Sequence, residues 1–410
     1  MKIKSFPQKL SVFLFLNLSM LGSSELKKEI LKLGELTSAP SFHPFSQTTK
    51  NENPRAILME SLPWEGKETR TYAWLGLPTV NKNEKVPGVV LVHGGGGTAF
   101  KNWVQEWNDR GFAAISIAVE GQIDKKVKNE KSNSKGKDKI AWGKHKWAGP
   151  HRIGIFADTH KPLQDQWMYH AVSQTILANS LLRSLPQVDE SKVGLMGTSW
   201  GGIISSIVMG IDQRFAFVIP VYGCGFLNEA GNHYTPALAN NSGYLNAWEA
   251  GHRFNRAKMP VLWFSWPGDK HFPMEILRKS YKATPGPSMV SLVPRMGHGH
   301  HPAWNRPESY AFAKRVLKSG KIWCQRLDSA LLDGQAYARF QSDEVLEKAE
   351  LVHTTDLGFT GKRNWIRTPI RLQKKADAWL ADWPLPDRTT AWFINVESDG
   401  LVVSSDYHDG

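Results

Sequence analysis

Apolar runs that alternate with segments of helical periodicity fill the middle of this chain. The run PGVVLVHGGGG is β-branched and ends in four glycines, which is typical of a buried parallel strand that leads into a loop. In the next segment, FKNWVQEWNDRGF, one helical face carries Trp103, Val104 and Trp107, and a second apolar run, AAISIAV, follows. Strand, helix and strand at this spacing predict a βαβ unit.

The same alternation continues to about residue 320. Helices are predicted from DQWMYHAVSQTILANSLLRSL, GGIISSIVMGI and PMEILRKSYKA, and strands from KVGLMG, FAFVIPVYG, MPVLWFSW and MVSLVPRM. This order predicts an α/β domain over residues 70–320, built on a mostly parallel sheet flanked by helices. Residues 25–69 are interpreted as an N-terminal extension of that domain.

The pattern changes after residue 320 to short stretches in which apolar and polar residues alternate. Examples are QAYARFQ, KAELVHTT, TPIRLQ and TAWFINVES, separated by Gly, Pro and Asp. Such alternation suits strands with one side facing water, so residues 321–410 are predicted to form a small C-terminal antiparallel β-sandwich.

The chain begins with lysines, then an apolar run over residues 10–21, then the small residues Gly22, Ser23 and Ser24. That order predicts a signal peptide over residues 1–24 and therefore a secreted or periplasmic protein. The apolar run is too short for a stable membrane anchor. A retained amphipathic start is the alternative, because no Ala-x-Ala cleavage site is present.

Length and charge limit the classes of protein further. A chain of 410 residues exceeds what one core usually serves, in agreement with one large and one smaller body. The net charge is +13, and the excess is uneven, because DKKVKNEKSNSKGKDK, residues 124–139, concentrates lysines among Gly, Ser and Asn, a composition typical of a solvated loop. This loop has no aromatic residue for stacking bases, which argues against nucleic acid, whereas attraction of an anionic polysaccharide stays open.

The segment VGLMGTSWGGI carries the strongest chemical signal. It places Ser199 at the centre of a Gly-x-Ser-x-Gly pattern between a β-branched strand and an apolar helix, which is the pattern of a nucleophile elbow. The serine of such an elbow sits in a sharp, strained turn, and the flanking glycines remove side chains that would collide. The alternative is a glycine-rich turn that only packs.

A serine hydroxyl needs a base to accept its proton and a carboxylate to orient that base. Asp269 follows the strand VLWFSW, although it could also be a surface turn residue, and RMGHGHHPAW follows the next strand. His298 comes first after that strand between two glycines, so it is the predicted base. His300 is the alternative, and His301, before a proline, is expected to be structural or exposed.

A metal site is an alternative interpretation of the same histidines. His298 and His300 form a His-x-His pair, but no third ligand stands near them in the sequence, so neither a metal nor a cofactor is predicted. An oxyanion needs two preorganised N–H donors, and the backbones of Trp200 and Gly95 are predicted to supply them. His93 is expected to hold the glycine loop rather than to react.

Two other sets of residues receive no chemical role. Cys224 and Cys324 lie in apolar contexts that suit buried free thiols, so no disulfide is predicted. Six aromatic residues at predicted loop ends are interpreted as packing anchors rather than sugar platforms: Trp142, Trp147, Trp167, Tyr222, Trp266 and Trp304.

Taken together, HGGGGTAFKNW, EGQ, DQWMYHAV, GTSWGG, IPVYGCGFL, GDKHFP and MGHGHHPAW resemble the α/β-hydrolases of the acetyl xylan esterase and dienelactone-hydrolase-like family. The resemblance covers roughly residues 60–320 and implies Ser199, Asp269 and His298 as a catalytic triad. The tail TAWFINVESDGLVVSS is similar to the sandwich appended to such proteins. Lys270 beside the acid and the long lysine-rich insertion depart from the family pattern, and they bear on the substrate rather than on the chemistry.

The resemblance implies a secreted serine esterase that cleaves a small-molecule or polysaccharide ester, with acyl groups on a carbohydrate as the expected substrate. One alternative is a prolyl-oligopeptidase-like serine peptidase, although the chain lacks the repeated β-blades that gate peptides in that fold. The other is a non-catalytic carbohydrate-binding protein on a hydrolase scaffold. The acyl group, the alcohol, the oligomeric state and the role of residues 124–146 are not determined by the sequence.

Overall fold

The computed structural model describes residues 22–45, 52–79, 81, 84–128 and 140–409. Most of the predicted signal peptide, residues 1–21, and most of the lysine-rich loop, residues 129–139, lie outside this part of the chain.

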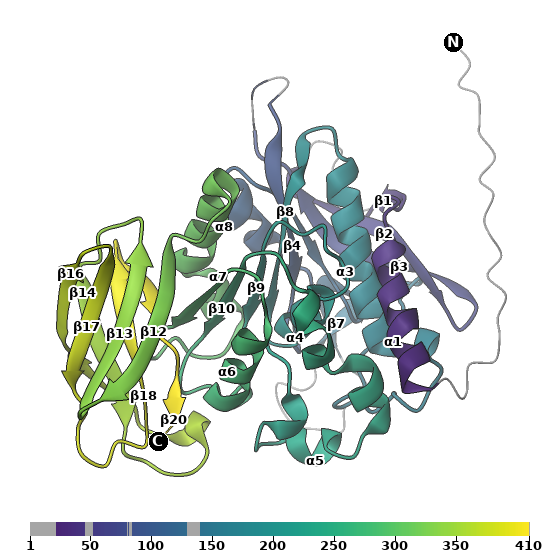
Figure 1. Ribbon diagram of the computed structural model, residues 1–410. Helices are drawn as coiled ribbons and strands as arrows, with labels where there is room; N and C mark the ends of the chain where they lie inside the picture. The colour runs from purple at the N-terminus through teal and green to yellow at the C-terminus, as the bar shows by residue number, and fades with distance from the viewer. Residues whose placement is uncertain (1–21, 46–51, 80, 82–83, 129–139, 410) are drawn as a thin grey trace.

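A nine-stranded sheet forms the centre of the larger region (Figure 1), in the spatial order β1-β2-β3-β5-β4-β8-β9-β10-β11. The strands from β5 to β11 in this order run parallel to one another, and β1, β2 and β3 add to them in antiparallel fashion. The predicted mostly parallel sheet is therefore confirmed. Its strands are β1 (Phe42–Pro44), β2 (Arg55–Trp64), β3 (Lys67–Gly76), β4 (Val86–Val92), β5 (Ala113–Ile117), β8 (Val188–Thr198), β9 (Val218–Val221), β10 (Val261–Ser265) and β11 (Ser288–Leu292).

The sheet begins earlier in the chain than residue 70, where the sequence had placed the start of the domain. That boundary falls inside β3, and β2 lies wholly in the predicted N-terminal extension. Ile30 and Leu33 of the same extension are buried in the core. Residues of the extension therefore belong to the body of the larger region.

Helices cover both faces of the sheet (Figure 1). On one face α2 and α8 pack together, with the rings of Trp107 and Tyr310 4.7 Å apart, and on the other α3 packs beside α4. The helices are α1 (Ser23–Lys32), α2 (Lys101–Asn108), α3 (Trp167–Ser184), α4 (Trp200–Val208), α5 (Tyr234–Leu238), α6 (Met274–Ala283), α7 (His300–Trp304) and α8 (Pro307–Ser319). Short helical turns are η1 (Leu33–Glu35), η3 (Leu163–Asp165), η4 (Leu227–Glu229), η5 (Tyr244–Trp248), η6 (Ala250–Arg256) and η7 (Thr360–Lys362). None of the described helices is long and apolar enough to cross a membrane.

The described ends of the lysine-rich segment form a hairpin. Strands β6 (Gln122–Lys128) and β7 (Ile140–Lys144) pair in antiparallel fashion as a separate two-stranded sheet. The sequence had predicted a solvated loop from residue 124, and ordered strand pairing at the two ends corrects that prediction.

The C-terminal region consists of two antiparallel sheets, as predicted. One has the order β12-β13-β17-β16, and the other has the order β15-β14-β18-β19 with β20 beside β18. The segment TPIRLQ, predicted as one strand, is divided between the two sheets at Ile370. The strands are β12 (Cys324–Leu332), β13 (Gln335–Ser342), β14 (Lys348–Thr354), β15 (Ile366–Pro369), β16 (Arg371–Lys375), β17 (Ala378–Pro384), β18 (Ala391–Ser398), β19 (Leu401–Ser404) and β20 (His408–Asp409).

Polar contacts join the two regions along β11. The backbone N–H of Leu292 donates to Oγ of Ser404 at 2.9 Å, and Nδ2 of Asn395 donates to the Leu292 carbonyl at 3.1 Å. Arg326 donates to the Ser288 carbonyl at 3.1 Å.

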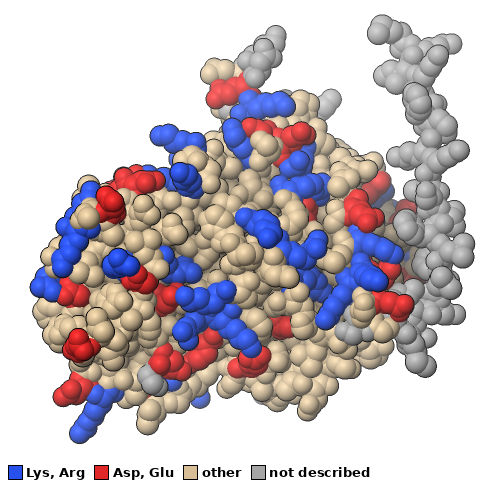
Figure 2. Space-filling view, viewed as in Figure 1, with Lys and Arg blue, Asp and Glu red and all other residues tan. Residues whose placement is uncertain are grey.

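Side chains of both charges are scattered over both regions on the face that Figure 2 shows. Cys224 and Cys324 are both buried and free.

Candidate active site

Ser199 stands in a strained turn between β8 and α4. Its backbone has φ 57° and ψ −114°, a conformation that is costly for a residue with a side chain. A Cβ atom on Gly197 would lie 2.0 Å from the carbonyl oxygen of Gly201, and one on Gly201 would lie 2.0 Å from that of Val92. The glycines of the predicted elbow are therefore required by the close approach of helix and strand.

The three predicted catalytic side chains lie in one line of hydrogen bonds. Nε2 of His298 is 3.0 Å from Oγ of Ser199, and Nδ1 of His298 is 2.8 Å from Oδ2 of Asp269. Because a carboxylate only accepts, Nδ1 donates to Asp269, and Nε2 of the neutral ring is left to accept from the hydroxyl. This arrangement can move a proton from the serine to the imidazole.

The carboxylate of Asp269 is fully buried and has four donors around it. Oδ1 accepts the backbone N–H groups of His271 and Phe272, at 2.8 and 2.9 Å. Oδ2 accepts from Nε1 of Trp266 at 3.1 Å, in addition to His298. These bonds compensate for the loss of water on burial and fix the orientation of the carboxylate.

Aromatic rings hold the imidazole of His298 in place. The ring of Tyr222 is 4.7 Å from it, and that of Phe272 lies nearly parallel at 6.1 Å. His271 is also 4.7 Å away, and burial, followed by the neighbouring His298, lowers the pKa of His271. Only 22% of the His298 side chain is exposed, so the ring has few orientations open to it.

His93 anchors the glycine loop, residues 94–97. Its Nε2 accepts the backbone N–H of Val119 at 3.1 Å, so its Nδ1 carries the proton and donates to the Gly94 carbonyl at 2.7 Å. Burial lowers the pKa of His93 to about 4, which keeps the ring neutral in this role. The expectation that His93 holds the loop agrees with these contacts.

His300, the alternative base, contacts the same loop. Its Nε2 accepts the backbone N–H of Gly94 at 2.9 Å, and burial lowers its pKa to about 4. Its hydrogen bond therefore goes to Gly94, while the hydroxyl of Ser199 contacts His298. His301 is exposed. Within the described residues, no three His, Cys, Asp or Glu side chains are grouped as metal ligands would be.

The two residues predicted to supply the oxyanion donors, Gly95 and Trp200, lie next to each other. A Cβ atom on Gly95 would be 3.0 Å from Cδ1 of Trp200, and Trp200 is the first residue of α4, where a backbone N–H has no acceptor within the helix. Neither N–H donates to another group of the described chain. The loop that carries Gly95 is fixed from outside, because Trp142 and Gln122 donate to the carbonyls of Gly96 and Gly97 at 2.8 and 2.9 Å.

Sequence reasoning missed the roles of several side chains. Trp266 and Trp142 were interpreted as packing anchors, but their indole N–H groups bond the carboxylate of Asp269 and the glycine loop. Only their position directly after or near predicted strands marked them in the sequence.

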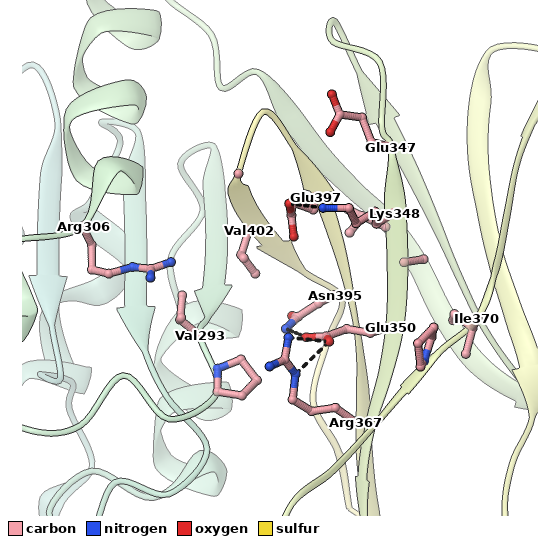
Figure 3. A pocket seen from close by; sticks show the side chains of 15 residues that line it. Val293, Arg306, Glu347, Lys348, Glu350, Arg367, Ile370, Asn395, Glu397 and Val402 are labelled. Atoms are coloured by element: carbon pink, nitrogen blue, oxygen red, sulfur yellow. Dashed lines mark hydrogen bonds and ion pairs between the residues drawn. The ribbon is translucent and has the colours of Figure 1, made fainter.

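A cavity of about 620 Å³ lies elsewhere, between the end of β11 and the C-terminal sheets (Figure 3). None of the three triad residues lines it. Four of its charged side chains form two ion pairs, Lys348 with Glu397 at 3.0 Å and Arg367 with Glu350 at 2.8 Å. Arg306 pairs with Glu308 beside the cavity, so most of the charges that line it are neutralised by a partner.

Part of the chain matches a known protein family. Residues 52–231 match the model of the acetyl xylan esterase (AXE1) family. A search of curated proteins gave no significant match. The matched residues include Gly95, Ser199 and Trp200, whereas Asp269 and His298 follow them in the chain.

Two solved structures share the fold. Acetyl xylan esterase from Paenibacillus sp. R4 is 17% identical, with a TM-score of 0.55, and the alignment covers 72% of this chain and 93% of that one. Acetyl xylan esterase 1 from Thermoanaerobacterium sp. JW/SL YS485 is 15% identical, with a TM-score of 0.51 and coverage of 68% and 88%. Likeness at this level of identity shows the fold, and it confirms the predicted α/β-hydrolase architecture.

Proposed function

From the premise that this chain is a serine ester hydrolase with the α/β-hydrolase fold, similar to acetyl xylan esterases over residues 52–231, we propose that it removes acyl groups from a carbohydrate. The proposal includes Ser199 as nucleophile, His298 as general base and Asp269 as the group that orients the base. The observation that carries it is the unbroken chain of hydrogen bonds from Asp269 through His298 to the strained Ser199.

The reaction proceeds in two steps. Oγ of Ser199 attacks the ester carbonyl while Nε2 of His298 takes its proton, and the same proton then passes to the leaving alcohol. The backbone N–H groups of Gly95 and Trp200 stabilise the negative oxygen of the tetrahedral intermediate. Water, deprotonated by His298, then attacks the acyl-enzyme and releases the acid.

The carbohydrate part of the proposal is supported by the family match and by the two neighbours whose names are acetyl xylan esterases. Export is proposed as well, to the periplasm or the outside of the cell, because lysines, an apolar run and small residues follow one another at the start of the chain. An exported enzyme meets polymeric substrates that do not enter the cytoplasm.

A fluorophosphonate probe and an ester panel test the proposal. The probe is expected to label the wild-type protein but not Ser199→Ala, and the control Ser319→Ala, at an exposed site on α8, should keep its labelling. With acetylated sugars as substrate, Ser199→Ala should lower kcat at least about a thousandfold, because attack without the nucleophile leaves only binding and oxyanion stabilisation.

The alternatives predict different results in the same experiment. Faster cleavage of aryl-peptide amides than of acetylated sugars would favour the peptidase. Absence of labelling in protein with a cooperative unfolding transition would favour the non-catalytic binding protein.

A further inference from the structure

The guanidinium of Arg152 lies beside the two residues whose backbones are predicted to supply the oxyanion donors. Its Cζ is 4.6 Å from the centre of the Trp200 ring. Its Nη2 is 3.5 Å from the position that a Cβ atom on Gly95 would take. A permanent positive charge therefore lies close to the proposed position of the scissile ester, although the triad chemistry does not require it.

Two of the three guanidinium nitrogens have partners. Nη1 donates to the Gly154 carbonyl at 2.8 Å, and Nε points to Oε1 of Glu120 at 3.4 Å. Nη2, the nitrogen nearest Gly95, donates to no group of the described chain. The Arg152 side chain is 24% exposed, so it is held in place and still reaches solvent.

Glu120 neutralises this charge only in part. The separation of 3.4 Å is long for a charge-assisted hydrogen bond, which is usually shorter than 3 Å. Burial raises the pKa of Glu120, and the nearby Arg152 opposes that effect without reversing it. A net positive potential therefore remains at the Nη2 side of Arg152.

The β6–β7 hairpin adds further positive charge to the same part of the site. Trp142 of β7 and Gln122 of β6 bond the glycine loop directly, and Nζ of Lys144 is 3.4 Å from Nδ1 of His151. The hairpin's only described acid, Asp124, accepts from Nε1 of Trp74. Five exposed lysines lie on the described hairpin and the two residues after it: Lys125, Lys126, Lys128, Lys144 and Lys146.

We propose that Arg152 determines substrate specificity by binding a carboxylate of the substrate, so that the preferred ester is an acylated acidic carbohydrate containing a uronic acid. This inference rests on the proposed function and specifies its substrate. Nη2 supplies the direct hydrogen bonds to the carboxylate. The lysines of the hairpin attract the polyanion over a longer range and raise its local concentration at the site.

The test uses matched esters that differ in one group. One substrate is an acetylated oligosaccharide with a uronic acid, the second is the same oligosaccharide with that carboxyl reduced to an alcohol, and the third carries a sulfate instead. The wild-type enzyme is expected to show a higher kcat/KM on the first than on the second, mainly through a lower KM. Higher salt should reduce this preference, because it screens the charges.

Variants of Arg152 then locate the preference. In Arg152→Gln the ratio of kcat/KM between the carboxylate and alcohol substrates should fall about ten- to a hundredfold, as for loss of a hydrogen bond to a charged group. Arg152→Lys keeps the charge without the planar fork, so it should retain part of the ratio. Arg388→Gln, which removes an exposed charge from the C-terminal region, should keep the wild-type ratio.

Each other outcome overturns the inference in a recognisable way. Equal cleavage of the carboxylate and alcohol substrates by the wild-type enzyme would overturn it while leaving the esterase function intact. A fall in kcat that is the same for both substrates in Arg152→Gln would show that the guanidinium acts on the oxyanion instead. Preference for the sulfated ester alone would replace the uronic acid by a sulfated sugar. Cleavage of none of the three would overturn the proposed function as well.

Discussion

The nine-stranded sheet and the C-terminal sheets show two different uses of β-structure. In β5 and β10 every residue is buried, whereas in β13 and β16 exposed positions recur along the strand. In the first region Ser199 has a strained backbone at the elbow. In the second the residues with positive φ include Asp333 and Asp399, which lie in hairpin turns. The comparison suggests that one region performs the chemistry and the other supports it.

Support is visible where η7 meets the turn that carries the acid. A Cβ atom on Gly361 would lie 2.4 Å from the carbonyl oxygen of Asp269. The neighbouring Thr360 donates from Oγ1 to the Glu275 carboxylate at 2.8 Å. The C-terminal region therefore packs directly against the backbone of Asp269, which makes the division between the two regions testable.

The largest effect is expected from loss of the Asp269 carboxylate, and Asp382 in the C-terminal region is the matched control. In Asp269→Asn, an amide NH₂ facing Nδ1 of His298 favours the tautomer with the proton on Nε2, which cannot accept from Ser199. Ester turnover should fall about ten-thousandfold in kcat. Asp382→Asn, which breaks an exposed ion pair with Arg371, should leave turnover within about twofold. Steady-state kinetics check both, and a large loss in Asp382→Asn would contradict the proposed division.

A smaller effect is expected from adding one methyl group where the regions meet. Gly361→Ala forces the η7 turn away from Asp269, and such overpacking should lower the free energy of unfolding by about 2 kcal/mol. Because the carboxylate orients His298, kcat should fall too. Gly149→Ala is the control, since its new methyl group would meet its neighbours at 3.8 Å, an ordinary contact distance. Urea unfolding and ester kinetics measure both changes, and unchanged kcat in Gly361→Ala would mean that the contact supports only the fold.

The smallest effect concerns acid stability. Burial lowers the pKa of His93 and of His408, one in each region, to about 4. As the pH falls below about 6.5, these histidines bind protons in the unfolded chain but stay neutral in the folded one. Their contribution to the free energy of unfolding is therefore complete above that pH and is lost towards pH 4.

The fully buried His93 should account for about 1 kcal/mol of the loss between pH 7 and 5.5, and the partly exposed His408 for less. Urea unfolding at both pH values should show a weaker pH dependence in His93→Gln than in the wild type, and His408→Gln should lie between them. The reverse order of the two variants would contradict the greater burial of His93.

Local pattern was sufficient to predict the α/β order, the elbow at Ser199 and the chain order of Asp269 and His298. These features depend on apolar periodicity and on glycines close to the serine in sequence, which a single chain displays. The prediction of one strand over TPIRLQ is wrong at residue 370. Pro369 lacks the N–H that would continue the strand, and the chain crosses there to the other sheet.

Other features depend on contacts between residues far apart in the chain. The bond from Gly94 to His300 joins positions 206 residues apart, so no local spacing reveals that His300 holds the glycine loop. The pairing of β2 and β3 with the parallel sheet was missed for a similar reason, since β2 mixes buried and exposed residues without regular alternation. Whether a strand belongs to the sheet depends on the strands it pairs with rather than on its own pattern of buried and exposed residues.

The contacts along β11 have a consequence for association between molecules. This strand is the last of the nine-stranded sheet, and the open side of a terminal strand is where a strand of another chain can add. Here Ser404 and Asn395 occupy the N–H and carbonyl of Leu292, and Arg326 occupies the carbonyl of Ser288. The C-terminal region thereby blocks sheet extension at this border and protects the enzyme against edge-to-edge aggregation.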